Sequence, residues 1–278
     1  MCLTYLATRR LIIGVLSVVA WPAQADFDEI YRLDIGATIV DFDSKVGINS
    51  RDDSINKEID FEDLGFDSKV QLGVIKGTWR MADRHRLSLL YTQIKRATEV
   101  TTKNDIEVDG NIIRAGAYVG ASVKTHVFDI EYLYSYFKRP NLELSVSAGI
   151  YWMNSLTELS AAGEIRIEGE NQDEFRNDVN AYQRLIAPLP LLGLSASYEI
   201  NPQWIAHAYA RYFDVTINDV EGRILSLTLK TEYFFTDYLA LGSAVTSFDV
   251  NVKQSGVVFI NTLGYEYSGL QAYLVLKY

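Results

Sequence analysis

Alternation of apolar and polar residues with a period of two constrains this chain more than any other feature. Between Tyr31 and Ile39 every second residue is apolar, and the same pattern recurs at 142–155 and 266–278. Successive side chains of a β-strand point to opposite faces of the sheet, so this pattern is typical of strands with one apolar face. Helical periodicity is hard to find beyond residue 26. We therefore expect an all-β protein.

Ten segments carry the pattern and predict about ten antiparallel strands, with eight or twelve as alternatives. The segments are 31–42, 67–80, 85–97, 121–137, 142–155, 190–200, 203–214, 222–235, 238–249 and 266–278. Short connections near Met81, Arg139, Asn201 and Asp237 alternate with connections that are mostly longer and polar. The longer ones are 43–66, 98–120, 156–189, 215–221 and 250–265. This asymmetry is typical of bacterial outer-membrane barrels, which have short periplasmic turns, longer outer loops and an even number of strands.

The second of these segments is irregular. Its apolar phase runs through Val70, Leu72 and Val74 and then shifts to Trp79. A shift of phase within a strand is the expected result of one extra residue, so the sequence predicts a β-bulge near Ile75.

The first 25 residues resemble an export signal. Arg9 and Arg10 precede an apolar run of eleven residues, and Ala23 and Ala25 then supply a small-x-small cleavage pattern. The run is shorter than the roughly 20 residues that a transmembrane helix needs. We expect residues 1–25 to be a cleaved signal peptide and residues 26–278 to form one domain, with an uncleaved anchor as the alternative. Cys2 is the only cysteine, which excludes disulfides and cysteine-bound metals from the mature chain.

Charge and aromatic content narrow the class of protein further. The formal net charge of −10 argues against nucleic acid as a partner. Aromatic residues are frequent, with 18 Tyr, 12 Phe and 4 Trp, and several lie at predicted strand ends, including Phe137 and Phe234. Rings at strand ends suit the interface between membrane and water. The predicted interface aromatics are Trp79, Tyr136, Trp204, Phe235, Tyr238 and Tyr278.

The predicted strands of about 11–14 residues exceed the roughly 5–6 usual in globular sheets. Backbone groups inside lipid must all be paired, which leaves a closed barrel as the only β-structure that can span a bilayer. The sequence therefore predicts a closed antiparallel transmembrane β-barrel, with a soluble β-sandwich as the alternative.

Two features resemble known proteins. The segment from Leu270 to Tyr278 ends on an aromatic residue and resembles the signal by which the barrel-assembly machinery recognises outer-membrane proteins. The stretches from Asp83 to Tyr91 and from Ala187 to Leu194 are similar to segments of small proteobacterial outer-membrane barrel proteins of the OmpA-like barrel type. The resemblance implies a barrel in the outer membrane of a Gram-negative bacterium, and no established activity comes with it.

The polar phase of the strands predicts a charged lumen. The residues concerned are Arg32, Asp34, Asp129, Glu131, Glu143, Glu199, His207, Arg211, Lys230, Glu232 and Lys277. A ten-stranded barrel has a narrow interior, and buried charges are costly unless paired, so we expect these side chains to pair and fill the lumen. A narrow channel for small polar solutes is the alternative.

We expect no catalytic residue, cofactor or metal. An outer-leaflet lipid-modifying enzyme would need an activated nucleophile with a base in reach. Of the three histidines, His85 is predicted at a periplasmic turn, His126 on the lipid-facing phase and His207 inside the barrel. Acidic residues in the long connections could bind Ca²⁺ or Mg²⁺, although a solvated loop is the default reading. They are Asp41, Asp43, Asp52, Asp53, Glu58, Asp60, Glu62, Asp63, Asp67, Glu164, Glu168, Glu170, Asp173, Glu174 and Asp178.

The expected role is structural or surface interaction. The expected partners are outer-membrane lipid, lipopolysaccharide and, during biogenesis, the barrel-assembly machinery. The protein is expected to be a monomer.

Overall fold

The computed structural model describes residues 27–50, 56–60, 62, 65–101, 106–108, 111–113, 118–167, 175–217, 220–255 and 259–278. The predicted signal peptide lies outside these residues. Within them no helix is long and apolar enough to cross a membrane.

The described residues form thirteen β-strands. They are β1 (Tyr31–Ser50), β2 (Asn56–Asp60), β3 (Lys69–Ala82), β4 (His85–Thr101), β5 (Ile106–Val108), β6 (Asn111–Ile113), β7 (Tyr118–Arg139), β8 (Leu142–Ile167), β9 (Phe175–Asn201), β10 (Trp204–Ile217), β11 (Val220–Thr236), β12 (Leu239–Ser255) and β13 (Phe259–Lys277).

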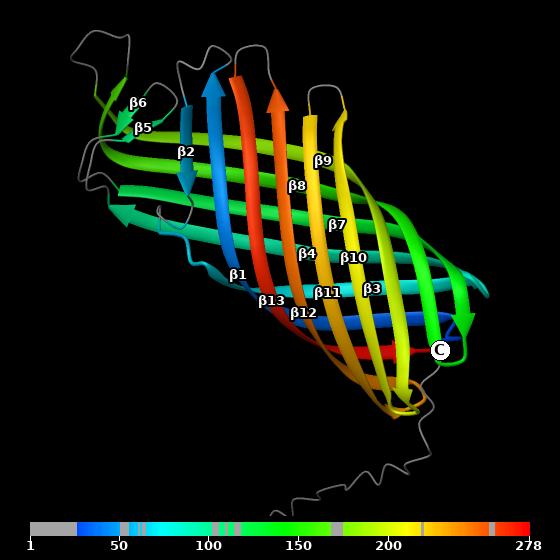
Figure 1. Cartoon of the computed structure of the whole chain (residues 1–278). Helices are drawn as coiled ribbons and strands as arrows, with labels where there is room; N and C mark the ends of the chain where they lie inside the picture. Colours follow the sequence, from blue (N-terminus) through cyan, green and yellow to red (C-terminus); the bar gives the residue numbers. More distant parts are fainter. Residues whose placement is uncertain are drawn as a thin grey trace, which may run out of the picture.

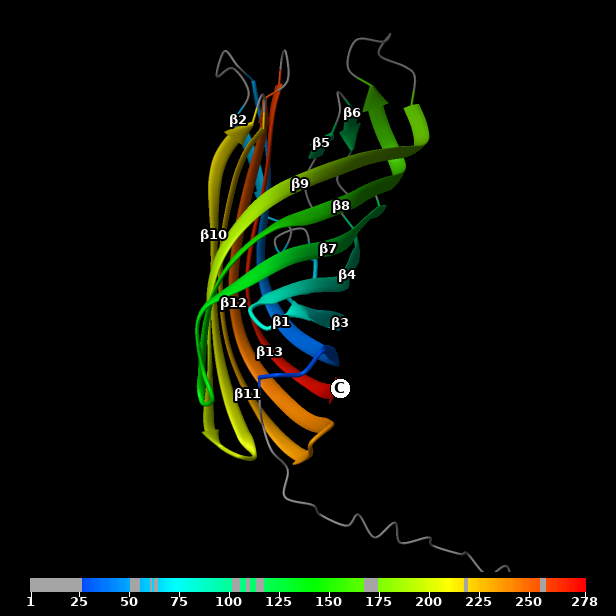
Figure 2. The same cartoon turned by 90° about the vertical axis from the view of Figure 1, so that its right-hand side faces the viewer.

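Ten of these strands close into a barrel (Figures 1 and 2). The order around the barrel is β1, β3, β4, β7, β8, β9, β10, β11, β12 and β13, every neighbouring pair is antiparallel, and β13 pairs with β1. The predicted closed antiparallel barrel of ten strands is therefore confirmed. The short strand β2 pairs with residues 45–49 of β1. The β5–β6 hairpin pairs with the end of β8.

The short connections lie together at one end of the barrel. They are the turns at 83–84, 140–141, 202–203 and 237–238, and the C-terminus lies at the same end (Figure 1). We call the half of the barrel next to these turns the turn-side half, which on β1 comprises 31–39. The other half, which on β1 comprises 40–50, is the far half.

The strands continue well beyond their predicted ends. The strand β8 runs to Ile167 and β9 begins at Phe175, so most of the predicted loop 156–189 is strand. The strand β1 likewise extends to Ser50 through part of the predicted loop 43–66. The predicted loop boundaries were therefore wrong at these places.

The error has a physical cause, because the polarity of the barrel wall inverts along each strand. In the turn-side half of β1, Leu33 and Ile35 face outward while Asp34 is buried inside. In the far half of the same strand, Phe42 is buried inside and the outward residue Asp43 is exposed. Apolar and polar residues alternate in both halves, but the apolar residues face outward in the turn-side half and inward in the far half.

The same inversion explains why the predicted bulge near Ile75 was wrong. The pairing of β3 with β1 continues without interruption from Lys69 to Trp79, and the register of β3 with β4 shifts only between Arg80 and Ala82. Leu72 is buried inside the barrel opposite Thr38, where the two halves meet, whereas Ile75 and Trp79 face outward in the turn-side half. The apolar phase therefore changes face without an inserted residue.

Candidate functional site in the barrel lumen

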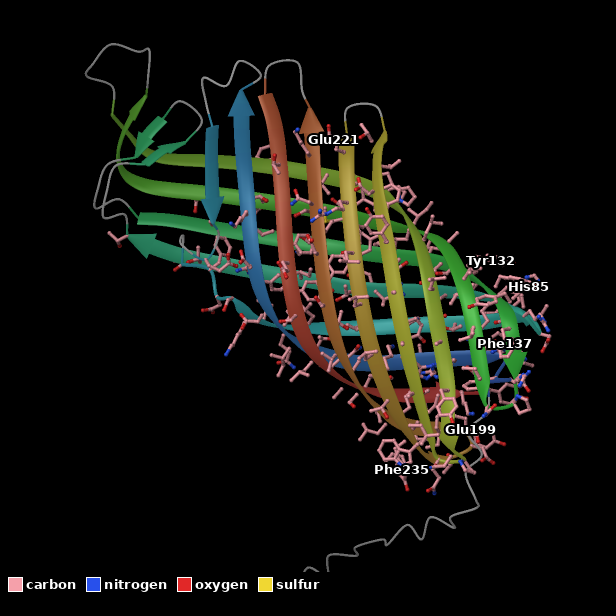
Figure 3. All side chains as sticks on the ribbon, viewed as in Figure 1. His85, Tyr132, Phe137, Glu199, Glu221 and Phe235 are labelled. Atoms are coloured by element: carbon pink, nitrogen blue, oxygen red, sulfur yellow. The ribbon has the colours of Figure 1, made fainter. Side chains whose placement is uncertain are left out.

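The structure places ten of the eleven predicted lumen residues among the buried or half-buried charges inside the turn-side half. Those classed as buried are Asp34, Asp129, Glu131, Glu143, His207, Glu232 and Lys277. Arg32, Arg211 and Lys230 are half-buried and contact them. The remaining residue, Glu199, is half-buried near the turn at 202–203, at the rim of the barrel (Figure 3).

Glu232 on β11 is the centre of the first group of contacts. Its side chain is fully buried and accepts two hydrogen bonds from the Arg32 guanidinium on β1. The Tyr273 hydroxyl on β13 donates a further hydrogen bond of 2.8 Å, and His207 Nε2 on β10 lies 3.3 Å from the carboxylate. A Cβ at Gly242 would overlap the Tyr273 ring, so the glycine leaves the space that this ring fills. Side chains from three other strands thus contact the Glu232 carboxylate, and such contacts offset the cost of burying its charge.

A second group joins β7 to β10. Arg211 lies 2.8 Å from Glu131 and 3.3 Å from Asp129. The Ser147 hydroxyl donates a hydrogen bond to Glu131 from β8. Two buried polar atoms of the group, Asp129 Oδ1 and Arg211 Nε, have no hydrogen-bond partner among the described residues.

The third group lies nearest the turns and contains two residues that the sequence reasoning missed. Glu143 on β8 lies 3.1 Å from Arg80 on β3 and 3.2 Å from Arg86 on β4. The Ser135 hydroxyl also donates to this carboxylate, at 2.5 Å. Both arginines occupy the inward phase of their strands, which is the signal that could have found them. On β3 the predicted bulge near Ile75 obscured this inward phase.

A third missed lumen residue is Lys76 on β3. Its ammonium lies 5.1 Å from the centre of the Tyr209 ring on β10, within the range of a cation–π contact. The strands β3 and β10 are five places apart around the barrel in either direction. This contact therefore crosses the full width of the lumen.

The far half has a different interior, which is mainly apolar and aromatic and contains a buried arginine, Arg96, over the Phe42 ring. The hydroxyl groups of Tyr151 on β8 and Tyr265 on β13 are 2.9 Å apart, and Tyr265 also donates to the Met153 sulfur at 3.6 Å. Phe248 stacks on the Tyr265 ring, with centroids 5.8 Å apart. Because β8 and β13 are also five places apart, the Tyr151–Tyr265 contact again spans the barrel. The sequence reasoning placed Tyr151, Met153 and Phe248 in predicted strands but Tyr265 in the predicted loop 250–265, so it did not bring this layer together.

A cavity of about 120 Å³ lies between the charged and the aromatic layers. Its walls include Lys76, Tyr209 and Arg211 on the charged side and Tyr151 and Phe248 on the aromatic side. A cavity of roughly 150 Å³ is large enough for benzene or a few water molecules. Among the described residues, side chains from opposite walls meet on both sides of this space, Lys76 with Tyr209 and Tyr151 with Tyr265.

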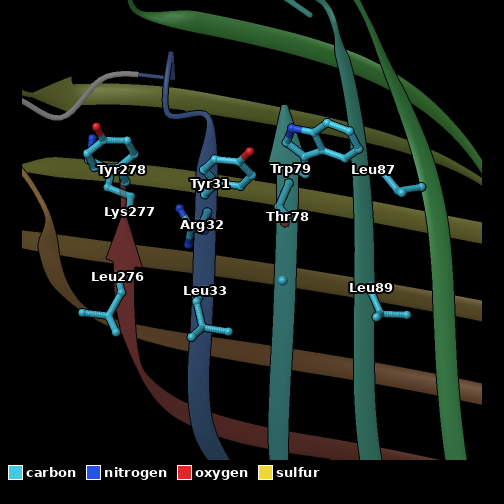
Figure 4. Close-up of a pocket in the computed structure, with 11 residues that line it drawn as sticks. Tyr31, Arg32, Leu33, Thr78, Trp79, Leu87, Leu89, Leu276, Lys277 and Tyr278 are labelled. Atoms are coloured by element: carbon cyan, nitrogen blue, oxygen red, sulfur yellow. The ribbon is translucent and has the colours of Figure 1, made fainter. Parts of the chain in front are cut away.

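The outer face of the turn-side half is a continuous apolar belt edged by rings. All six predicted interface aromatics, Trp79, Tyr136, Trp204, Phe235, Tyr238 and Tyr278, face outward and are exposed. Phe234 instead points inside and is fully buried, so its suggested place at the interface was wrong. Figure 4 shows Tyr278, Tyr31 and Trp79 side by side on neighbouring strands, one step nearer the turns than Leu276, Leu33 and Leu89. These rings frame a shallow groove of about 400 Å³ over Gly77, where no side chain fills the surface.

The histidines lie apart from one another. His85 faces outward beside Tyr132 at the turn-side rim (Figure 3), with a ring nitrogen 2.5 Å from the Tyr132 hydroxyl. His126 contacts Tyr91 and Gln93 on the outer face. His207 is buried in the lumen, where its Nδ1 lies 2.8 Å from the Ser197 hydroxyl. Neither His207 nor Ser197 lines the cavity between the charged and the aromatic layers.

Of the acidic residues predicted in the long connections, several are structured. Asp41 and Asp43 lie on β1, Glu58 and Asp60 on β2, Glu164 on β8 and Asp178 on β9, whereas Asp52, Asp53, Asp63, Glu168, Glu170, Asp173 and Glu174 lie outside the described residues. Glu62 accepts hydrogen bonds from the Ser44 N–H and from Arg96. Burial by itself would raise the pKa of Glu62, but these hydrogen bonds outweigh it and lower the pKa. Within the described part of the chain, no group of three or more acidic, histidine or cysteine residues is arranged to hold a metal ion.

No protein-family model and no curated protein matches the chain. Among solved structures, the outer membrane protease OmpT from Escherichia coli matches with a TM-score of 0.55 and 11% sequence identity, over 91% of this chain and 98% of that chain. The toluene transporter TodX from Pseudomonas putida matches with a TM-score of 0.38 and 9% identity, over 90% of this chain and 89% of that chain. Ail, the attachment invasion locus protein of Yersinia pestis, matches with a TM-score of 0.31 and 7% identity, over 86% of this chain and 98% of that chain. The likeness to OmpT shows that the chain has the fold of an outer-membrane β-barrel.

Proposed function

We propose that this protein is an integral outer-membrane barrel of a Gram-negative bacterium, and that its filled lumen serves a structural or surface-interaction role and does not conduct solutes. The hydrogen bond between Tyr151 and Tyr265 carries this proposal, because it joins opposite walls of the barrel directly. A wall-to-wall contact at that level leaves no central path for a hydrated solute.

The outer surface supports the location. Leu229, Leu270 and Leu192 are each about two-thirds exposed on the turn-side half, which would be unfavourable in water and is expected where acyl chains cover the wall. The aromatic rings at its edge suit the two interfaces of a bilayer. In this orientation the short turns face the periplasm, and the strand β13 ends at the periplasmic side. Its final residues then lie where the barrel-assembly machinery would meet them.

Contacts across the lumen at three levels support a closed interior. Nearest the turns, Arg80 pairs with Glu143; further along, Lys76 lies over Tyr209; in the far half, Tyr151 meets Tyr265. The same filling supports a non-catalytic role, since His207 is enclosed within it and the other two histidines lie on the outer face.

The far half supports a role at the cell surface. Most of its described outward residues are polar, and it carries the additional strands β2, β5 and β6 (Figure 1). A wall with this polarity is suited to water and not to hydrocarbon, so in the proposed orientation it stands outside the membrane. A protein or glycan partner would meet this half first.

Planar bilayers test the closed lumen. The purified barrel is expected to give no unitary conductance steps, whereas the double variant Tyr151→Ala/Tyr209→Ala, which removes one partner from two wall-to-wall contacts, is expected to conduct. Heat-modifiable electrophoretic mobility verifies that each protein is folded. Regular conductance steps from the unaltered protein would overturn the filled-lumen proposal, and recovery of the folded chain in the soluble periplasmic fraction would overturn the location.

A further inference from the structure

Two lysines lie directly opposite each other on the outer face of the far half. Lys95 on β4 and Lys124 on β7 are Cα partners in the antiparallel register, and both side chains are exposed. Directly opposite residues have Cβ atoms about 4.5–5.5 Å apart, and like charges in this position destabilise a sheet. No carboxylate oxygen of the described residues lies within 4.0 Å of either ammonium. Among the described residues, the structure therefore retains an unfavourable pair that no carboxylate contacts directly.

A third cation continues the same row. Lys124 is the partner of Leu156 on β8, and Leu156 is the partner of the exposed Arg184 on β9. Three strand spacings separate Lys95 from Arg184, a distance of about 14 Å. Arg184 also has no carboxylate within 4.0 Å among the described residues. We call Lys95, Lys124 and Arg184 the basic row.

The basic row has a defined depth relative to the apolar belt. On the same wall, Tyr91, Phe128 and Trp152 form an outward aromatic row in register, and the Tyr91 and Phe128 rings are 4.9 Å apart. Each lysine lies four residues beyond the aromatic residue of its strand, which corresponds to about 13 Å along the strand. Strands tilted by about 40° reduce this to about 10 Å along the membrane normal.

Between these two rows lies a polar row made of Gln93, His126 and Asn154, which are also in register. The order from the belt outward is therefore aromatic, hydrogen-bonding and cationic. An amphiphile with acyl chains, a polar sugar and phosphate groups has its parts in the same order. Aromatic rings mark the boundary of the hydrocarbon, so the cations lie at the depth of the lipid headgroups.

We propose that the basic row binds the phosphate groups of lipopolysaccharide in the outer leaflet, which supply the counter-charge that Lys95 and Lys124 lack. This inference rests on the proposed outer-membrane location and goes beyond it by naming the lipid class and the binding wall. Lipid phosphates accept charge-assisted hydrogen bonds from lysine and arginine. The acyl chains then lie against the aromatic row and the belt below it.

The test uses the purified full barrel in neutral detergent, titrated with lipid A carrying two phosphates. Native mass spectrometry counts the lipid retained per barrel. The double variant Lys95→Gln/Lys124→Gln is expected to bind at least about 10-fold more weakly, the scale of a lost hydrogen bond to a charged group. Lys69→Gln is the matched control, because Lys69 is also exposed on the far half but lies opposite Asp41. The binding of lipid A to this control variant is expected to be unchanged.

Further measurements distinguish the lipid from other anions. Lipid A without phosphates is expected to bind the unaltered protein as weakly as it binds the double variant. Without lipid, the double variant is expected to unfold at a higher urea concentration than the unaltered protein, since the repulsion between the two lysines is gone. Equal binding of phosphorylated lipid by both proteins would overturn the proposal, as would saturation of the site by inorganic phosphate at the same concentrations as lipid A.

The proposed location is measured separately, by membrane fractionation and by bilayer recordings. The double variant is expected to reach the outer membrane and to remain electrically silent. If it fails to fold, the single substitution Lys124→Gln replaces it, because one exposed change leaves the wall intact while still removing the opposed pair. A barrel that fractionates correctly but binds lipid A independently of these lysines would overturn only the lipid site.

Discussion

The two halves of this barrel have the same backbone architecture and opposite polarity. In the turn-side half the wall is apolar outside and the core contains ion pairs, such as Arg32 with Glu232. In the far half the outer face carries charges, such as Arg223 with Asp249, and the core is mainly aromatic and aliphatic, with Arg96 as a buried charge beside Phe42. The pleat of the strands decides which residue faces inward, and the surroundings of each half decide which chemistry is tolerated there.

This difference in polarity locates the boundary of the membrane on the barrel wall. A wall facing hydrocarbon favours apolar residues outside and leaves the polar ones to pair in the lumen. A wall facing water favours polar residues outside, and the core then follows the rule for soluble proteins. The inversion on each strand therefore gives the boundary of the lipid-covered zone from side-chain chemistry alone.

The sharpest way to break this comparison is to remove one ion-pair partner from each half. Glu232→Ala is expected to destabilise the barrel by about 3–5 kcal/mol, because it leaves Arg32 buried without its main counter-charge. Asp249→Ala breaks an ion pair on the outer face of the far half, and its expected cost is about 0–1 kcal/mol. Urea unfolding in lipid vesicles measures both values. Equal losses would contradict a charged core that differs from a solvated surface.

A charge added to the outer wall compares the outer faces of the two halves. Leu229→Arg introduces a cation on the belt and is expected to cost about 2–4 kcal/mol if the site is near the bilayer midplane. Ser268→Arg places the same side chain on the outer face of the far half, where its expected effect is within about 0.5 kcal/mol. The same unfolding assay compares the two. A belt that tolerated arginine as well as the far half would not be lipid-covered.

The smallest expected effect concerns the segment that follows β2. The pKa of Glu62 is lowered in the folded barrel by its hydrogen bonds from Ser44 and Arg96. A lowered folded-state pKa means that the stabilisation is present above the unfolded value of 4.5 and is lost as the pH falls through the folded value. Limited proteolysis between pH 7 and pH 3 is expected to show cleavage near residues 62–68 only at the acidic end. The variant Glu62→Gln should be cleaved to the same extent throughout this range; if its pH dependence matched that of the unaltered protein, the effect would not come from Glu62.

Much of the fold followed from the sequence because one regularity recurs on all ten strands. Alternation with a period of two identified the strand core around Ile35, Ile130 and Leu274, and antiparallel closure followed from the short turns. The outward placement of Trp79 and Tyr278 likewise follows from position within that alternation. These features are local, so a single sequence contains them.

The candidate lumen was predictable only in part. Alternation placed Arg32 and Glu232 on one face, but it could not show that they meet, because 200 residues separate them. Arg80 and Lys76 were missed because the inversion of polarity on β3 resembles a bulge. The aromatic layer was missed because Tyr265 fell in a predicted loop, and because alternation cannot show that it meets Tyr151, 114 residues away.

The sequence by itself determined the central part of each barrel strand, most of the inward and outward faces and the closed sheet, since each depends on neighbouring residues and on the pairing of backbone groups. Only the tertiary structure decided how the lumen is filled, which charges pair across it and where Lys95 meets Lys124. Those contacts depend on the register between strands and on the way the barrel closes, which bring together residues that are distant in the chain.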